Sequence, residues 1–101
     1  MPVSLNSRER AWLKARAQRL NPVVRIGKAG LSEPVLKSVD QALAGQELIK
    51  VKFDEFKEQR HELAPLLAAK TASLLIAQIG HIAVLYRKRE GQTMNSKPDS
   101  E

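Results

Sequence analysis

Three consecutive segments constrain the fold of this chain more than any other feature. A short apolar run, Val23–Ile26, is followed by the glycine-bracketed tetrapeptide Gly27–Gly30 and by an amphipathic stretch from Ser32 to Gly45. Residues 47–53 then alternate between apolar and lysine side chains, which is typical of a half-buried strand. We therefore predict a strand–loop–helix–strand unit, in which a right-handed crossover joins two parallel strands.

The glycine loop between the first strand and the helix is suited to an anion. Glycine lets the backbone approach a bulky group and adopt dihedral angles closed to other residues. The helix that follows offers free N–H groups and the positive end of its dipole, and Lys28 adds a full charge. The glycine spacing fits neither a nucleotide-binding P-loop nor a dinucleotide-binding fingerprint. KH domains place a similar loop between two helices, whereas a strand precedes it here. The alternative is a turn that binds nothing.

The positive charge of the chain is gathered in its N-terminal third. The net charge is +6. Residues 1–30 hold seven basic side chains against Glu9 alone, and basic and acidic residues cancel over the rest of the chain. Such one-sided charge, beside a loop that is suited to bind an anion, favours a polyanionic partner. The alternative is a basic helix that is simply solvated. The basic residues are Arg8, Arg10, Lys14, Arg16, Arg19, Arg25 and Lys28.

A helix is predicted before the first strand. It should start at Asn6 or Ser7, because an asparagine followed three residues later by glutamate resembles a capping box. It should end at Asn21, because the residue before a proline disfavours the helical conformation. The core-facing stripe is Leu13, Ala17 and Leu20. Trp12 lies beside that stripe, where core packing is its ordinary role and stacking on a base is the alternative.

The second half of the chain predicts a helix and a hairpin. A charged connection over residues 54–60 precedes a helix that ends near Lys70, and Pro65 requires that helix to start near Glu62 or to bend. Residues 73–87 predict an antiparallel hairpin that turns at Gly80-His81, although their periodicity also permits a longer helix. Residues 89–101 are polar and predict a disordered tail, so the domain would comprise residues 1–88. The core is expected to contain both phenylalanines, Phe53 and Phe56.

The composition fits one small domain without a catalytic centre. The 101 residues are enough for one core, and no apolar run approaches the ~20 residues that cross a bilayer. The absence of cysteine, and an N-terminus unlike a signal peptide, suit the cytoplasm. His61, His81 and the adjacent carboxylates Asp54 and Glu55 have no spacing typical of a triad or metal site. We expect a cytoplasmic monomer without enzymatic activity, cofactor, metal, membrane attachment or small-molecule substrate.

Two segments carry a resemblance to a known family. Residues 5–14 (Leu-Asn-Ser-Arg-Glu-Arg-Ala-Trp-Leu-Lys) and residues 20–33, which include the glycine loop, resemble the CRM domain of chloroplast RNA splicing and ribosome maturation. The similarity is greatest to the stand-alone bacterial YhbY-type form. Residues 47–51 and 78–87 also fit this pattern, so the resemblance covers about residues 5–87.

The resemblance implies both a fold and a function. The elements predicted above have the order α-β-α-β-α-β-β, a small mixed sheet flanked by helices in a single domain, and the resemblance implies an α/β fold similar to the C-terminal domain of translation initiation factor three. The function would be RNA binding, with ribosomal RNA in precursors of the large subunit as the partner and ribosome assembly as the role. The alternative is a module that binds a ribosomal or other acidic protein through its basic helix. The resemblance assigns the RNA contact to Gly27, Lys28, Ala29 and Gly30, and the charge placement adds Arg25, Arg8, Arg19, Arg16 and Lys14.

Overall fold

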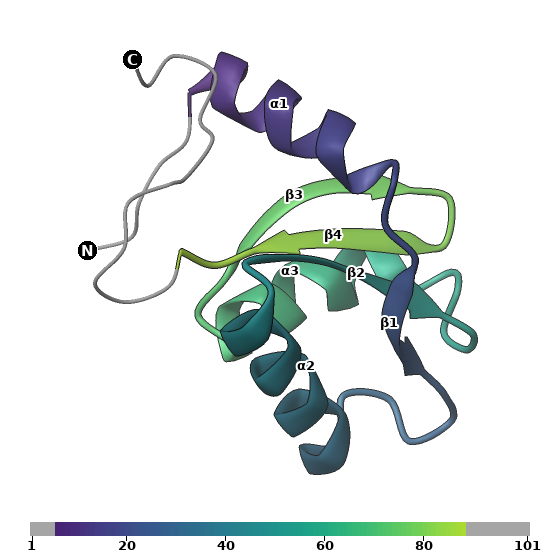
Figure 1. Ribbon diagram of the computed structural model, residues 1–101. Helices are drawn as coiled ribbons and strands as arrows, with labels where there is room; N and C mark the ends of the chain where they lie inside the picture. The colour runs from purple at the N-terminus through teal and green to yellow at the C-terminus, as the bar shows by residue number, and fades with distance from the viewer. Residues whose placement is uncertain (1–5, 89–101) are drawn as a thin grey trace.

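Residues 6–88 form a four-stranded sheet with helices on both faces in the computed structural model (Figure 1). The predicted order α-β-α-β-α-β-β is confirmed. The predicted tail, residues 89–101, lies outside the described residues. Within residues 6–88, no helix has the length and apolarity needed to cross a membrane. The elements are α1 (Ser7–Ala17), β1 (Pro22–Ile26), α2 (Glu33–Gly45), β2 (Leu48–Phe53), α3 (Arg60–Lys70), β3 (Leu74–Ile79) and β4 (Ile82–Tyr86).

The sheet has the strand order β1-β2-β4-β3. The strands β1 and β2 are parallel, as the strand–loop–helix–strand pattern predicts, and Arg25 lies opposite Lys52 in their register. The strands β3 and β4 form the predicted antiparallel hairpin around Gly80 and His81. The last strand, β4, lies between β2 and β3 and joins the hairpin to the parallel pair.

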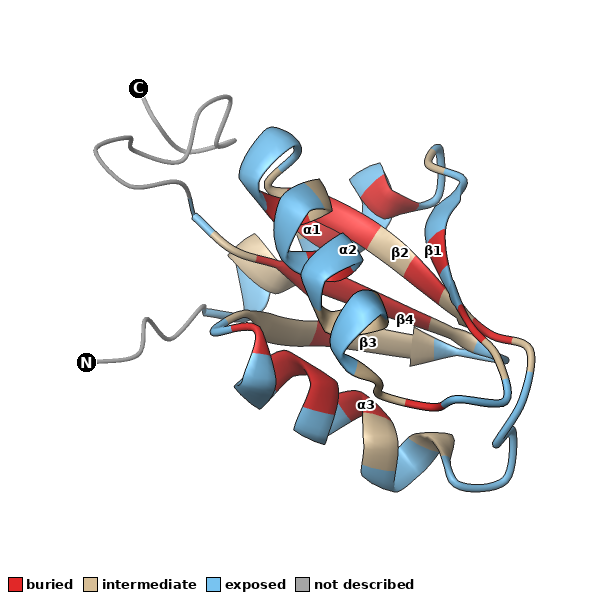
Figure 2. Cartoon of the chain, turned by 90° about the horizontal axis from the view of Figure 1, so that it is seen from below, coloured by how far each residue is buried: buried red, intermediate tan, exposed pale blue. Residues whose placement is uncertain are grey.

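Two hydrophobic clusters hold the helices against opposite faces of the sheet. The helices α2 and α3 cover one face of the sheet and turn buried residues toward it (Figure 2). There, Val39, Leu43 and Leu67 pack on the inward side chains of β1, β2 and β4. On the other face, α1 packs Leu13 and Ala17 against residues of β2, β3 and β4. The predicted core stripe of the first helix is therefore confirmed, with Leu20 packed at its edge. The sheet is covered unevenly, since the α1 cluster contains no residue of β1.

Helix boundaries differ from the prediction at two places. The capping box of α1 is present, because the Glu9 N–H donates to Asn6 Oδ1 at 2.7 Å and the Asn6 N–H donates to Glu9 Oε1 at 3.1 Å. However, α1 ends at Ala17 and not at Asn21. After Ala17, hydrogen bonds from each N–H to the carbonyl three residues earlier extend a tighter helical turn to Leu20. The other difference is the start of α3 at Arg60, which leaves Pro65 inside the helix.

The expectation that both phenylalanines lie in the core is wrong for one of them. Phe53 is fully buried, whereas Phe56 is 39% exposed. Phe53 is the last residue of β2 and follows the inward alternation of that strand. Phe56 follows the strand, in the β2–α3 loop, where strand alternation no longer decides which side chains point inward.

Arg10 has a structural role that its charge alone does not indicate. Its Nη1 donates to the carbonyl oxygens of Leu75 at 2.9 Å and Ile76 at 3.2 Å. These residues form an irregularity of β3, where the register with β4 shifts between Leu75 and Ala77. A shifted register disrupts the ladder locally, and the guanidinium of Arg10 donates to two carbonyl oxygens at this irregularity. Arg10 therefore fixes the flank of α1 that faces β3.

The buried hydroxyl of Tyr86 predicts a loss of stability in alkali. Its Oη is buried, and it has no hydrogen-bond partner within residues 6–88. Burial raises the pKa of Tyr86 from 10.0 to about 12, and the negative charges of Glu47 and Glu9 contribute further. Between these values the unfolded chain ionises while the folded protein stays protonated, so the free energy of unfolding should fall as the pH rises from about 10 to about 12. Tyr86→Phe should remove this slope in urea denaturation, without lowering stability at neutral pH. An unchanged slope in the variant would assign the effect to another group.

Candidate nucleic-acid interface

The glycine loop is a tight turn with Lys28 and Ala29 at its exposed tip. The Gly30 N–H donates to the Gly27 carbonyl at 2.9 Å and closes the turn. Gly30 has a φ of +67°, a conformation that favours glycine, whereas Gly27 has no such requirement and an added Cβ there would meet nothing within 4 Å. Of the two glycines, only Gly30 therefore requires the conformational freedom of glycine, and its N–H is already used inside the turn.

The start of α2 offers fewer donors than a free helix N-terminus. Ser32 is the N-cap, but its side chain makes no capping hydrogen bond. Pro34 lies in the first turn and has no N–H, and the carboxylate of Glu33 lies at the positive end of the helix dipole. An anion at this loop would therefore be attracted mainly by full side-chain charges, of which Lys28 is the first.

The β2–α3 loop lies beside the glycine loop. The N–H groups of Asp54 and Glu55 both donate to the Ile26 carbonyl, at 3.0 and 3.1 Å. Arg25 Nη1 lies 3.5 Å from Asp54 Oδ2, and both side chains are at least one-third exposed. The two loops therefore meet at the carboxyl ends of the parallel strands β1 and β2. An exposed pair of this kind contributes little to stability, so the Arg25 guanidinium can exchange its carboxylate for another anion.

The face of β1 and β2 on the α1 side of the sheet carries cations. Strand alternation places Val24, Ile26, Val51 and Phe53 in the α2–α3 core, so Arg25, Lys50 and Lys52 belong to the opposite face. Arg25 and Lys52 are neighbours in the parallel register. The α1 cluster does not extend over β1, and Val23 is 49% exposed there. We call Arg25, Lys28, Lys50 and Lys52 the basic face.

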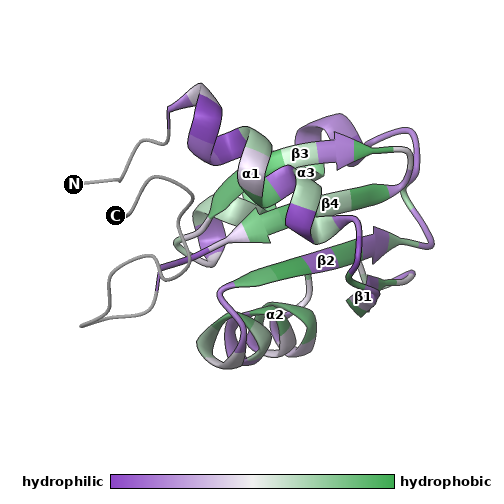
Figure 3. Ribbon diagram, turned by 45° about the horizontal axis from the view of Figure 1, so that its top comes forward, coloured by the Kyte–Doolittle hydropathy of each residue, from purple (hydrophilic) through white to green (hydrophobic). Residues whose placement is uncertain are grey.

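The flanks of α1 divide its own cations into two groups. Arg10 bonds to β3, and at about 100° per residue Lys14 lies on that same flank. At the same spacing, Arg8, Arg16 and Arg19 lie on the flank opposite Arg10, away from β3. The helix α1 lies over the β3 and β4 side of the sheet, and the chain that follows it leads to β1 (Figure 3). The residues of this region that the sequence placed at the RNA are all exposed: Arg8, Lys14, Arg16 and Arg19. The fold thus brings Arg16 and Arg19 toward the basic face and separates Lys14 from it, while Arg8 lies at the far end of the helix.

Trp12 has the packing role that is ordinary for a tryptophan. It is half-buried and packs against the α1 cluster. The guanidinium carbon of Arg16 lies 5.1 Å from the centre of its ring, in a cation–π arrangement. A base could stack on Trp12 only after displacing Arg16, so the ring is a support for that arginine.

Lys50 and Lys52 were not among the residues singled out from the sequence. Their alternation with Ile49, Val51 and Phe53 does predict a polar face of β2. A polar strand face is usually solvated, however, and nothing in the alternation indicates that a basic helix and a basic loop would flank it. The sequence therefore predicts that Lys50 and Lys52 share one face of β2. Only the pairing of β2 with β1 places that face beside Arg25.

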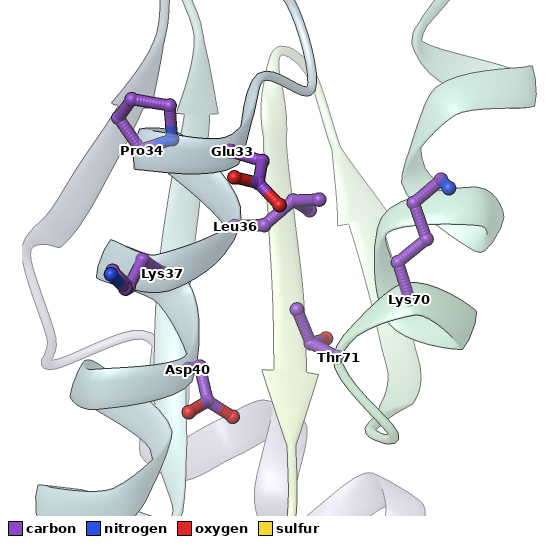
Figure 4. Close-up of a pocket in the computed structure, with 7 residues that line it drawn as sticks. All are labelled: Glu33, Pro34, Leu36, Lys37, Asp40, Lys70 and Thr71. Carbon is purple, nitrogen blue, oxygen red and sulfur yellow. The ribbon is translucent and has the colours of Figure 1, made fainter.

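A hollow between α2 and α3, on the other face of the sheet, has a different character. Leu36 and Thr71 line it together with two carboxylates and two amines, those of Glu33, Asp40, Lys37 and Lys70 (Figure 4). The opposite charges balance, so this hollow does not attract a polyanion. Within residues 6–88, no group of three or more His, Asp and Glu side chains is arranged to hold a metal ion.

The fold and the basic face define a class: a small mixed-sheet α/β domain with a cluster of cations on one loop and on the adjacent open part of the sheet. Comparison with known proteins identifies the family within this class. The chain belongs to the CRS1/YhbY (CRM) domain family, whose model matches residues 5–87.

Individual relatives agree with this assignment. The chain is 39% identical over 88 residues to a Haemophilus influenzae protein named "RNA-binding protein", covering 86% of this chain and 89% of that one. A Bacillus subtilis relative, also named for RNA binding, is 31% identical over 85 residues and covers 83% and 88% of the two chains. The solution structure of a Staphylococcus aureus protein superposes with a TM-score of 0.76 at 32% identity, over 89% of this chain and 95% of that one.

Proposed function

We propose that this protein binds structured RNA, without cleaving it, through the basic face and the adjacent flank of α1. The observation that carries the proposal is the pairing of Arg25 with Lys52 directly beside the Lys28 turn, on a part of the sheet that α1 leaves open. Membership of the CRM family and the names of its relatives support RNA as the polyanion. The proposed RNA is ribosomal RNA of large-subunit precursors, and the proposed role is assistance to ribosome assembly in the cytoplasm by a monomer.

The strand β1 sets the length of the proposed contact. Arg19 lies just before its amino end and Lys28 just after its carboxyl end. Five residues of strand span roughly 17 Å, so these cations can meet several successive phosphates. The Lys28 ammonium and the Arg25 guanidinium would hold phosphate oxygens at the turn, with the free N–H groups of Lys28 and Ala29 as further donors. Such binding would depend mainly on phosphates and shape, with limited readout of bases.

The proposal predicts a strong dependence of affinity on salt. About four phosphate contacts would lower the affinity for a ribosomal RNA hairpin roughly a hundredfold between about 50 and about 200 mM salt, because each contact releases condensed counterions. Fluorescence anisotropy with a labelled hairpin measures this directly. Affinity that barely changes over this range would contradict an electrostatic mode of binding.

A protein partner remains the second candidate, since a basic helix also suits an acidic protein surface. Treatment of a pulldown with nuclease separates the two candidates. Loss of ribosomal particles after nuclease supports RNA as the partner. Their persistence supports docking on a protein through α1.

A further inference from the structure

Phe56 is an exposed aromatic side chain directly beside the Lys28 turn. The residue is 39% exposed, and a Cβ built on Gly30 would lie 3.5 Å from its Cε2 atom and 3.8 Å from its Cζ atom. One edge of the ring therefore lies against Gly30, which has no side chain, and the residue as a whole remains accessible to solvent.

The backbone of Phe56 is held in an unfavourable conformation. Its φ is +56°, which is uncommon for a bulky residue, and glycine or asparagine would adopt it more readily. Strained residues of this kind persist where the surrounding structure holds them, and they cluster at functional sites. Stability alone would favour a small residue here, since this side chain is neither in the core nor in a relaxed conformation.

The β2–α3 loop holds the ring in place before any ligand arrives. Its start is anchored by the two N–H groups that donate to the Ile26 carbonyl, and the Gln59 N–H donates to the Phe56 carbonyl at 3.0 Å. Its end is anchored by Arg60, whose side chain donates to the Lys57 carbonyl and whose own carbonyl accepts from Gln78 Nε2 at 3.0 Å. A ring that is already positioned loses little conformational entropy on binding.

Charge separates the two sides of this site. The cations Arg25 and Lys28 lie on the β1 side. The hollow that contains Phe56 is lined by the carboxylates of Asp54, Glu55 and Glu58 and by one amine, that of Lys57, so its charge is negative on balance. This net negative charge disfavours a phosphate over the ring, whereas it does not repel a neutral base. Carboxylates also accept hydrogen bonds from the amino groups of guanine, cytosine and adenine, which uracil lacks.

From this arrangement we propose that Phe56 stacks on one unpaired nucleobase of the bound RNA, next to the phosphate held at the Lys28 turn. This inference rests on the proposed RNA-binding function and narrows the ligand to a structured RNA with an unpaired nucleotide, preferably one with an exocyclic amino group. Phe56 thereby adds selection of a base to a surface that otherwise contacts phosphates. Stacking of a base on an aromatic side chain is tolerant of sequence and strong enough to measure.

The test compares two RNA hairpins that differ at one position. One carries a single bulged guanosine and the other an abasic nucleotide at that site, and binding of the full chain is followed by fluorescence anisotropy. The wild-type protein should bind the guanosine hairpin roughly five- to thirtyfold more tightly than the abasic hairpin. Phe56→Leu keeps an apolar contact with Gly30 and should lose this preference, whereas Phe56→Trp should retain it. A hairpin with a bulged uridine should bind more weakly than the guanosine hairpin.

Leu66→Ala is the matched control, since Leu66 on α3 is an apolar residue of similar exposure (45% against 39% for Phe56), and it should leave the preference unchanged. Circular dichroism checks that each variant is folded. Equal wild-type binding to the guanosine and abasic hairpins, or a preference that survives in Phe56→Leu, would overturn stacking while leaving RNA binding intact. Tighter binding of the uridine hairpin would overturn the role of the carboxylates. Failure of the wild-type protein to bind any hairpin would overturn the proposed function itself.

Discussion

Replacement of Lys28 and Lys52 together by glutamate is expected to lower RNA affinity roughly 30- to 1,000-fold, which corresponds to about 2–4 kcal/mol for two charge-assisted contacts. Lys28 lies at the exposed tip of the glycine turn, and Lys52 lies beside Arg25 on the open sheet face. Both contacts would be lost, and each new carboxylate would repel a phosphate. The slope of log affinity against log salt should also decrease by about 2, because two fewer counterions are released. Anisotropy titrations at several salt concentrations measure both effects.

The control is a second double lysine-to-glutamate variant with the same net charge, in which both replaced lysines lie on the other face of the sheet. Lys37 and Lys70 line the hollow between α2 and α3. Each lysine-to-glutamate replacement removes two charges from the total of +6, so both double variants carry +2. Lys37→Glu with Lys70→Glu should weaken binding only slightly. Equal losses in the two double variants would show that overall charge, and not the basic face, attracts the RNA.

Phe53→Ala is expected to destabilise the protein by about 3–5 kcal/mol, a large fraction of the ~5–15 kcal/mol that stabilises a typical domain. Phe53 is fully buried and is among the largest side chains of the α2–α3 core. Truncation removes its transfer free energy and leaves a cavity, since helices on one side and strands on the other cannot collapse completely into the space. Urea denaturation followed by circular dichroism measures the loss. Phe53→Leu keeps much of the volume and should be less damaging.

The other phenylalanine of the chain supplies the comparison. Phe56→Ala removes the same atoms from an exposed ring, so it should cost about 1 kcal/mol or less. The two variants thus separate a residue that stabilises the fold from one proposed to bind a ligand. A loss at Phe56 as large as that at Phe53 would mean that its contact with Gly30 is part of the core.

These two phenylalanines also illustrate how far sequence patterns predict this protein. Phe53 continues the alternation of Ile49 and Val51, and a period of two predicts its burial correctly. Phe56 lies three residues later, where the strand has ended and composition alone suggested the core. Its position depends on the turn of the β2–α3 loop against Gly30, which is a contact between segments far apart in the chain.

The basic surface was predictable in part. The excess of charge over residues 1–30 indicated the polyanion site, but it did not distinguish the cations from one another. Arg10 bonds to β3 and Lys14 shares its flank, whereas Lys52, from another segment, lies beside Arg25. Helical periodicity orders side chains around one helix, and only the packing of that helix on the sheet decides which flank faces the ligand.

The order of the elements, the parallel strand pair and the terminal hairpin could be predicted from the sequence alone, and the resemblance to the CRM domain indicated the family. The elements follow from short-range patterns: alternation in strands, a capping box at Asn6, glycines at turns and a proline after the first helix. Packing between distant segments set three other features: α1 leaves β1 uncovered, Lys52 lies beside Arg25, and Phe56 lies beside the Lys28 turn. The first depends on the packing of α1 over β2, β3 and β4, and the other two depend on the parallel pairing of β1 with β2. These are contacts between residues far apart in the chain, which no local pattern encodes.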